Sequence, residues 1–103
     1  DKIFKDALHA GVTAAKPGGK MAEDWVRESA NANEETLRAI ADGILKKQIS
    51  KESGEMLLRE NARALQSEAA ALAVVIKASA QAAVNAFVSS LSTALSSALK
   101  LAL

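Results

Sequence analysis

The chain has 103 residues, enough for one small domain, and its 13 Lys and Arg against 12 Asp and Glu give a formal net charge of +1. A charge so close to zero gives no indication of a nucleic-acid partner, and the absence of cysteine excludes disulfides and thiolate metal sites. Half of the residues are hydrophobic, yet only two Phe and one Trp are aromatic. Alanine is the best helix former, and alternating runs of β-branched and aromatic residues are absent. The sequence therefore predicts an all-α fold, a small bundle of about four to five helices in a single domain over residues 1–103.

The first predicted element is a short helix over residues 1–16. Its apolar residues recur at helical spacing and form one face, made of Ile3, Phe4, Ala7, Leu8 and Val12. The helix should end at Lys16, because the following Pro17 disfavours a helical conformation in the residue before it and two glycines supply turn conformations.

Residues 20–50 predict two helices. Ala22, Trp25 and Val26 mark the inward face of the first one. Asn31 followed by Glu34 resembles a capping box and Asn33 is an alternative cap, so a second helix is expected to begin there. The inward face of this second helix holds Leu37, Ile40, Ala41, Ile44, Leu45 and Ile49.

An amphipathic helix is predicted over residues 51–79, capped by Ser50 or Ser53 and antiparallel to the helix before it. Asn61 and Glu68 fall on its apolar side. The main interpretation is that their stems pack while their polar ends reach solvent; the alternative is that they are buried in a helical seam and fix its register.

No glycine or proline occurs from Glu55 to Leu103. A single straight helix of that length would be far longer than a compact domain of this size, at about 1.5 Å per residue. The apolar stripe of residues 57–76 and the stripe that starts at Val84 also differ by roughly 140° on one helical wheel. We therefore expect the segment to be kinked, to be broken, or to change its packing partner near residues 77–83, with a separate amphipathic helix over 82–103.

This C-terminal helix is the predicted interaction site. Only Lys77 and Lys100 carry charge after Glu68. A large uncharged apolar surface that stays exposed usually marks a binding site. Small residues four apart would also let another helix approach closely. The predicted interaction residues are Val84, Phe87, Val88, Leu91, Leu95, Ala98, Leu99 and Ala102.

The sequence shows no pattern of residues typical of a catalytic, metal-binding or phosphate-binding site. His9 is the only histidine and lacks the orienting partners of a base or ligand. The stretch from Lys16 to Lys20 lacks the spacing of a phosphate-binding loop. We predict no catalytic, cofactor-binding or metal-binding residues, no cofactor, no small-molecule substrate and no enzymatic activity.

The predicted function is a non-enzymatic helical interaction or oligomerisation module, which binds itself or a protein partner through the C-terminal helix. The alternative is a membrane-active protein of the pore-forming, lysis or translocator type that uses the same segment. Residues 78–99 are uncharged and long enough to span a bilayer, although their Ser, Thr, Asn and Gln lower the hydrophobicity. Since the first residue is Asp1, we expect a chain that was processed or cut from a longer one; the compartment is left open.

Overall fold

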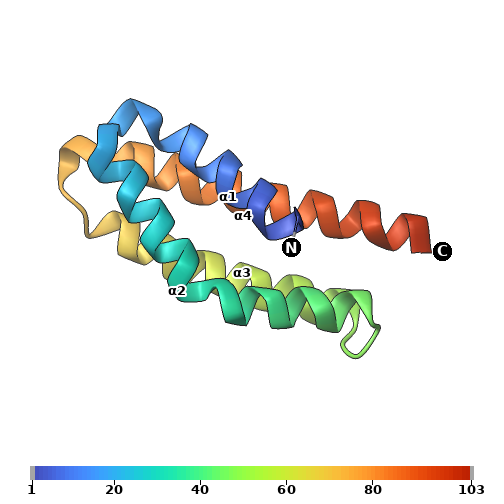
Figure 1. Cartoon of the computed structure of the whole chain (residues 1–103). Coiled ribbons are helices and arrows are strands. Elements are labelled where there is room, and N and C mark those ends of the chain that lie inside the picture. The colour runs from blue at the N-terminus through green and yellow to red at the C-terminus, as the bar shows by residue number, and fades with distance from the viewer. Residues whose placement is uncertain (1, 103) are drawn as a thin grey trace.

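The computed structural model describes residues 2–102, and the side chains of residues 2–98. The described residues are almost entirely helical, which confirms the all-α prediction (Figure 1). The elements in chain order are α1 (Lys2–Ala15), the short 3₁₀ helix η1 (Lys16–Gly18), α2 (Gly19–Leu45), α3 (Lys51–Ala70) and α4 (Val74–Ala102).

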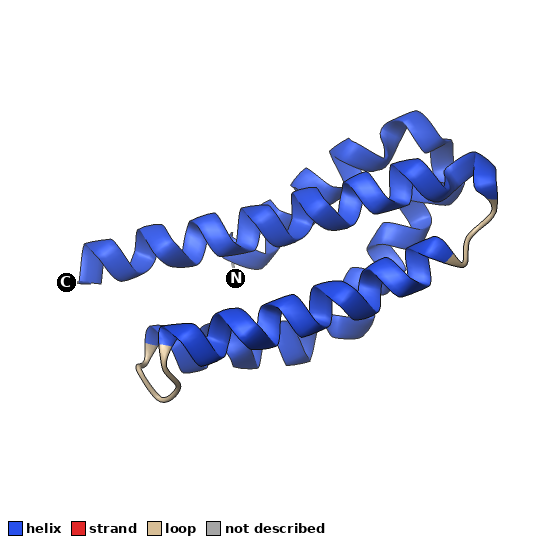
Figure 2. Cartoon of the chain, turned by 180° about the vertical axis from the view of Figure 1, so that it is seen from behind, coloured by secondary structure: helices blue, strands red, loops and turns tan. Residues whose placement is uncertain are grey.

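The helices form an elongated bundle in which α4 packs against each of the other three, as Figures 1 and 2 show. Within the described part of the chain, α1 and α3 do not contact one another. α1 is much shorter than α2 and α4, and its first turn lies beside the middle of α4. The ring of Phe4 meets the ring of Phe87 edge-on, with centroids 5.7 Å apart. α4 therefore continues well beyond the start of α1.

The core consists of two neighbouring apolar clusters. The first joins all four helices and contains Phe4, Ala7, Ala30, Leu37, Ile40, Ala41, Ile44, Leu58, Phe87, Leu91 and Leu95. The second lies toward η1 and contains Val12, Ala15, Ala22, Val26, Ile76 and Ala83. Burial of these side chains is the main stabilising contribution, since apolar burial is worth about 25 cal/mol per Å².

Gly11 allows α1 to approach α4 closely. A Cβ atom at this position would lie 3.3 Å from the carbonyl oxygen of Ala83, from Cβ of Phe87 and from Cγ1 of Val26. That is tighter than ordinary van der Waals contact, so a side chain here would push α1 away from its neighbours.

Residues 19–45 form one continuous helix, so the prediction of two helices in 20–50 is wrong. Asn33 does not cap a helix. Its Nδ2 donates to the carbonyl oxygen of Ser29, 2.8 Å away and one turn earlier, and its Oδ1 accepts from Nδ2 of Asn61 on α3 at 3.3 Å. The inward face simply continues through Ala30 and Asn33 to Leu37, because these residues are spaced three and four apart.

The break predicted near residues 77–83 is also wrong in position, because α4 is helical throughout that stretch. The chain turns instead at Ala71–Ala73, so the helix predicted over 51–79 ends at Ala70 and the one predicted over 82–103 begins at Val74. A kink or a change of packing partner within 77–83 stays a prediction.

The position of this turn explains the apparent shift between the two apolar stripes. Ile76 is buried on the same face of α4 as Ala80, Ala83 and Phe87, whereas the sequence pattern had joined it to the preceding helix. The turn contains no glycine or proline. Its backbone is satisfied locally, with the amides of Ala71 and Leu72 donating to the carbonyl oxygens of Glu68 and Ala69.

The turn between α2 and α3 is closed by two hydrogen bonds characteristic of a Schellman motif. The amide of Gln48 donates to the carbonyl oxygen of Gly43 at 2.9 Å, and that of Lys47 donates to the carbonyl oxygen of Ile44 at 3.1 Å. Lys47 occupies the left-handed position at φ 59°, where glycine is usual. Ser50 then caps α3, its Oγ accepting from the amide of Ser53 at 3.0 Å.

Candidate functional site

A groove separates the first half of α3 from the second half of α4. Figure 2 shows the two helices moving apart toward the α2–α3 turn. The groove has a volume of about 180 Å³ and is lined by Ile44, Lys51, Glu55, Leu58, Arg59, Val88, Ser92, Leu95 and Ser96.

A polar clasp links α3 to α4 at a point nearer to their shared turn than the groove is. Nε2 of Gln66 on α3 lies 2.9 Å from Oδ1 of Asn85 and 3.2 Å from the carbonyl oxygen of Gln81, both on α4. The clasp holds the helices together near their shared turn. Beyond it the α3–α4 interface opens into the groove.

The floor of the groove is apolar. Leu58 of α3 and Leu95 of α4 are buried, Val88 is half-buried, and the buried Ile44 of α2 lies between the two walls. Gly54 allows this arrangement, because a Cβ atom there would collide with the side chain of Ile44. α2 and α3 thus pack closely, and the side chain of Ile44 reaches the groove.

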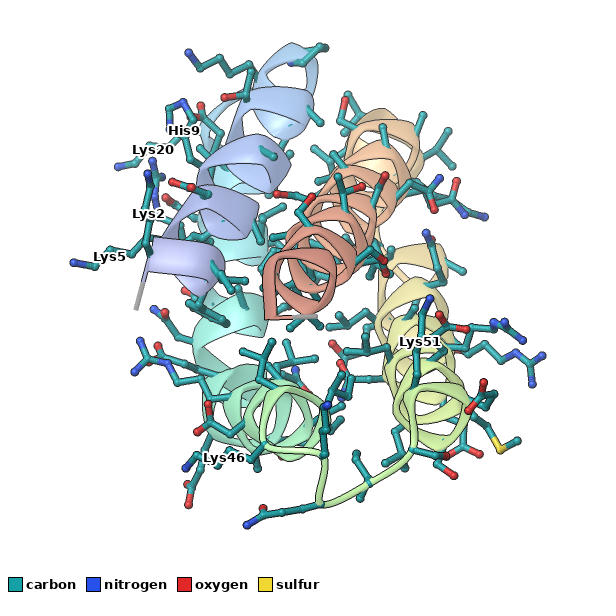
Figure 3. The ribbon with its side chains drawn as sticks, turned by 90° about the vertical axis from the view of Figure 1, so that its right-hand side faces the viewer. Lys2, Lys5, His9, Lys20, Lys46 and Lys51 are labelled. Carbon is teal, nitrogen blue, oxygen red and sulfur yellow. The ribbon has the colours of Figure 1, made fainter. Side chains whose placement is uncertain are left out.

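The two walls differ in chemistry. On α3, Nζ of Lys51 lies 4.0 Å from Oε1 of Glu55, with both side chains about half exposed, and Arg59 follows one turn later. Figure 3, which looks at the bundle from this end, shows Lys51 on α3 across from α4. On α4, Ser92 and Ser96 stand one turn apart and present only small hydroxyl side chains. Small residues at this spacing permit close approach of a further helix.

Most of the predicted interaction residues face the interior of the chain itself. Val84, Phe87, Leu91 and Leu95 are buried in the core. Val88 packs partly against the first cluster and Ala98 is half-buried, whereas the side chains of Leu99 and Ala102 lie outside those described. Among the predicted residues whose side chains are described, Val88 and Leu95 alone line the groove. The prediction that the whole stripe binds a partner stays a prediction, and it requires α4 to leave its neighbours.

The groove also contains residues that the sequence pattern did not single out. Ser92 and Ser96 belong to the polar side of α4, and Lys51, Glu55 and Arg59 read as an ordinary solvated helix face. The one available signal was the position of Ser92 and Ser96, one and two turns after Val88.

Neither His9 nor Glu68 lines the groove. His9 is exposed on α1, on the side away from α3 (Figure 3), and Glu68 is exposed on α3. Within the described residues, no group of three His, Cys, Asp or Glu side chains is placed to hold a metal ion. Asn61 is half-buried and bonded to Asn33, so it links α2 to α3 within one chain.

No protein-family model, curated protein or solved structure matches this chain. One helix of the described part, α4, is long and apolar enough over Val74–Ala98 to cross a membrane by length and composition, with 33% of its most apolar window buried inside the bundle. Core helices of soluble proteins meet the same criterion.

Proposed function

We propose that this protein is a non-enzymatic helical interaction module that self-associates through the groove between α3 and α4. The observation that carries the proposal is the apolar floor of the groove, formed by Leu58, Val88, Leu95 and Ile44, beside a wall of small residues. Leu58, Leu95 and Ile44 are already buried, so covering the groove removes from water mainly the half-buried Val88 and the remaining edges of the floor. Removal of apolar surface from water is the general driving force of helix-in-groove association.

A second copy of the chain is the partner that fits the groove best. Two copies related by a two-fold axis near Ser92 would place their α4 helices antiparallel, each against the groove of the other. Val88 of one copy would then lie opposite Ser96 of the other, so a larger side chain meets a small one. Because the surface is the same on both copies, both grooves are filled in a single interface.

The composition of α4 supports this arrangement. The stretch 78–99 carries no charge, so burying it against a second copy leaves no unpaired ion. The charged side chains of the groove, Lys51, Glu55 and Arg59, lie on the α3 wall, where they remain at the polar rim typical of protein interfaces.

Sedimentation velocity over a range of protein concentrations tests the proposal. We expect a concentration-dependent dimer for the natural chain and a monomer for Ser92→Arg, because a bulky cation on the α4 wall blocks the approach of the second helix. Ser97→Arg is the matched control, since Ser97 is exposed on the same helix but does not line the groove. A natural chain that stays monomeric, or two variants that behave alike, would contradict the proposal.

The length and composition of α4 favour a second candidate, a membrane-active protein that inserts this helix. Insertion requires α4 to separate from α1 and α2, and Trp25 reports on this because it lies with Val26, Ala83 and Val84 around a small pocket. Incubation with lipid vesicles should then change the fluorescence emission of Trp25. Unchanged emission in the vesicle-bound protein would contradict insertion of α4.

A further inference from the structure

Two turns meet at the end of the bundle opposite the groove. Figure 1 shows η1 and the α3–α4 turn side by side at this end. Their contact is close, because a Cβ atom at Gly18 would lie 2.7 Å from Cβ of Ser79 on α4, and Leu72 packs against the second core cluster. Residues 16–21 and 70–77 therefore lie at the same end of the bundle, and together we call them the end surface.

The end surface carries the most exposed large apolar side chains in the described part of the chain. Val74 is 88% exposed, Val75 is 82% exposed and Met21 is 68% exposed. Ala70, Ala71 and Ala73 beside them are exposed as well. Single exposed apolar residues are ordinary, but adjacent ones on a projecting turn are typical of a binding surface.

The charge on the end surface has one sign. Lys16 and Lys20 are exposed and Lys77 is half-exposed, whereas no Asp or Glu occurs in residues 16–22 or 69–84. The carboxylates closest in sequence lie just outside these segments: Glu68 on α3, and Glu23 and Asp24 on α2, of which Asp24 lies 3.9 Å from NH1 of Arg27. The exposed valines thus share this end of the bundle with three lysines, and the two segments that form it contain no carboxylate.

We propose that the end surface docks the bundle on a membrane that contains anionic lipids. Val74 and Val75 enter the boundary between headgroups and acyl chains, and the ammonium groups of Lys16, Lys20 and Lys77 meet the lipid phosphates. Lysine suits this position because its stem packs along apolar groups while its charge stays at the headgroup level. The two valines protrude rather than line a groove, so they fit a fluid lipid surface better than a shaped protein partner.

This docking differs from the insertion of α4. The bundle stays intact, because the core residues of α4 remain covered by the other helices and only the outermost turns touch lipid. The proposal is also independent of self-association, since the groove lies at the opposite end of the molecule.

Vesicle co-sedimentation of the full chain tests the proposal. We expect binding to phosphatidylcholine vesicles that contain phosphatidylserine, and weaker binding to phosphatidylcholine alone or at high salt, because salt screens the attraction between lysines and lipid phosphates. The double variant Val74→Ser, Val75→Ser should lose at least about tenfold in affinity, since it removes both apolar contacts.

A matched control is provided by Met56→Ser, Leu57→Ser. These residues are 60% and 40% exposed on α3, so two exposed apolar side chains are replaced by serine away from the end surface. This control should bind vesicles as the natural chain does. An absence of binding by the natural chain, or equal losses in the two double variants, would overturn the proposal.

The charge contribution is tested in the same way. Lys16→Gln, Lys20→Gln should weaken binding to the anionic vesicles, whereas Lys46→Gln, Lys47→Gln makes the same change in charge at the other end of the bundle and should have little effect (Figure 3 labels Lys20 and Lys46). An equal response of the two pairs would mean that net charge alone attracts the chain, and docking through the end surface would be rejected.

Discussion

The two halves of α4 have similar compositions and very different surroundings. From Ile76 to Leu91 one face of the helix is packed inside the bundle, with Ala80 and Ala83 fully buried, and α1 runs beside it. From Ser92 onward α1 has ended, and the helix borders the groove that it lines together with α3. The small residues of α4 therefore have two roles. In the covered half they permit close packing inside the chain, and in the other half they leave room for a further helix.

A proline in the covered half gives the largest expected effect. Ala80 lies inside the continuous helix, so Ala80→Pro should lower the free energy of unfolding by about 3 kcal/mol or more, through loss of a backbone hydrogen bond and a clash with the preceding turn. Val74→Pro is the control. It places proline at the first position of α4, where its missing amide hydrogen is not needed, and should change stability little. Chemical denaturation followed by circular dichroism measures both, and a tolerated Ala80→Pro would mean that the helix is broken there.

Truncating one leucine in each half compares the two regions directly. Leu91 and Leu95 are both 3% exposed, but only Leu95 lines the groove. Leu91→Ala should cost about 4 kcal/mol and Leu95→Ala about 2 kcal/mol, because water or rearranged side chains can fill space beside an existing groove more easily than inside a closed core. Equal losses in denaturation experiments would indicate that the groove is closed in solution.

The turn that borders the groove provides a smaller effect. Ser50→Ala removes the side-chain acceptor that caps α3 and should lower stability by about 1 kcal/mol. Ser53→Ala is the control, because Ser53 contributes its backbone amide to this cap and the amide is kept. Thermal denaturation of both variants separates the two serines, and a larger loss for Ser53→Ala would contradict the assignment of the cap.

The smallest predicted effect is a gain in stability. Lys47 holds a left-handed backbone conformation that costs a residue with a side chain about 1 kcal/mol, so Lys47→Gly should raise the free energy of unfolding by up to about that amount. Lys46→Gly should not, since Lys46 has a φ of −87°, which any residue adopts. Denaturant midpoints of the two variants are the measurement, and a loss of stability in Lys47→Gly would show that the side chain of Lys47 contributes contacts.

Local signals were reliable where the chain contains a strong one. The end of α1 follows from Pro17 and the glycines after it, and the cap of α3 was one of two serines considered. The Asn31–Asn33 signal failed, because the partner of Asn33 is Asn61, which is 28 residues away in the sequence and next to it in space. The turn at Ala71–Ala73 was missed because alanine favours helix and carries no sign of a stop.

Local sequence also could not show what covers the predicted interaction residues. Periodicity identifies Val84, Phe87, Leu91 and Leu95 as one apolar face, and that face exists in the structure. The sequence pattern of an apolar face is the same whether another part of the chain or a different molecule covers that face. The groove, by contrast, is lined by residues of α2, α3 and α4 that are far apart in the sequence, so no local pattern predicts it.

The sequence by itself determined that this protein is helical, because alanine-rich composition and helical spacing act within a few residues. It also determined that charge is concentrated before Glu68 and that α4 is apolar and uncharged along most of its length. Only the tertiary structure decided that α1 packs along the first half of α4, that a groove opens beside the second half, and that Val74 and Val75 are exposed at the same end of the bundle as η1. These features depend on contacts between residues far apart in the chain, and such contacts are set by side-chain packing rather than by local propensity.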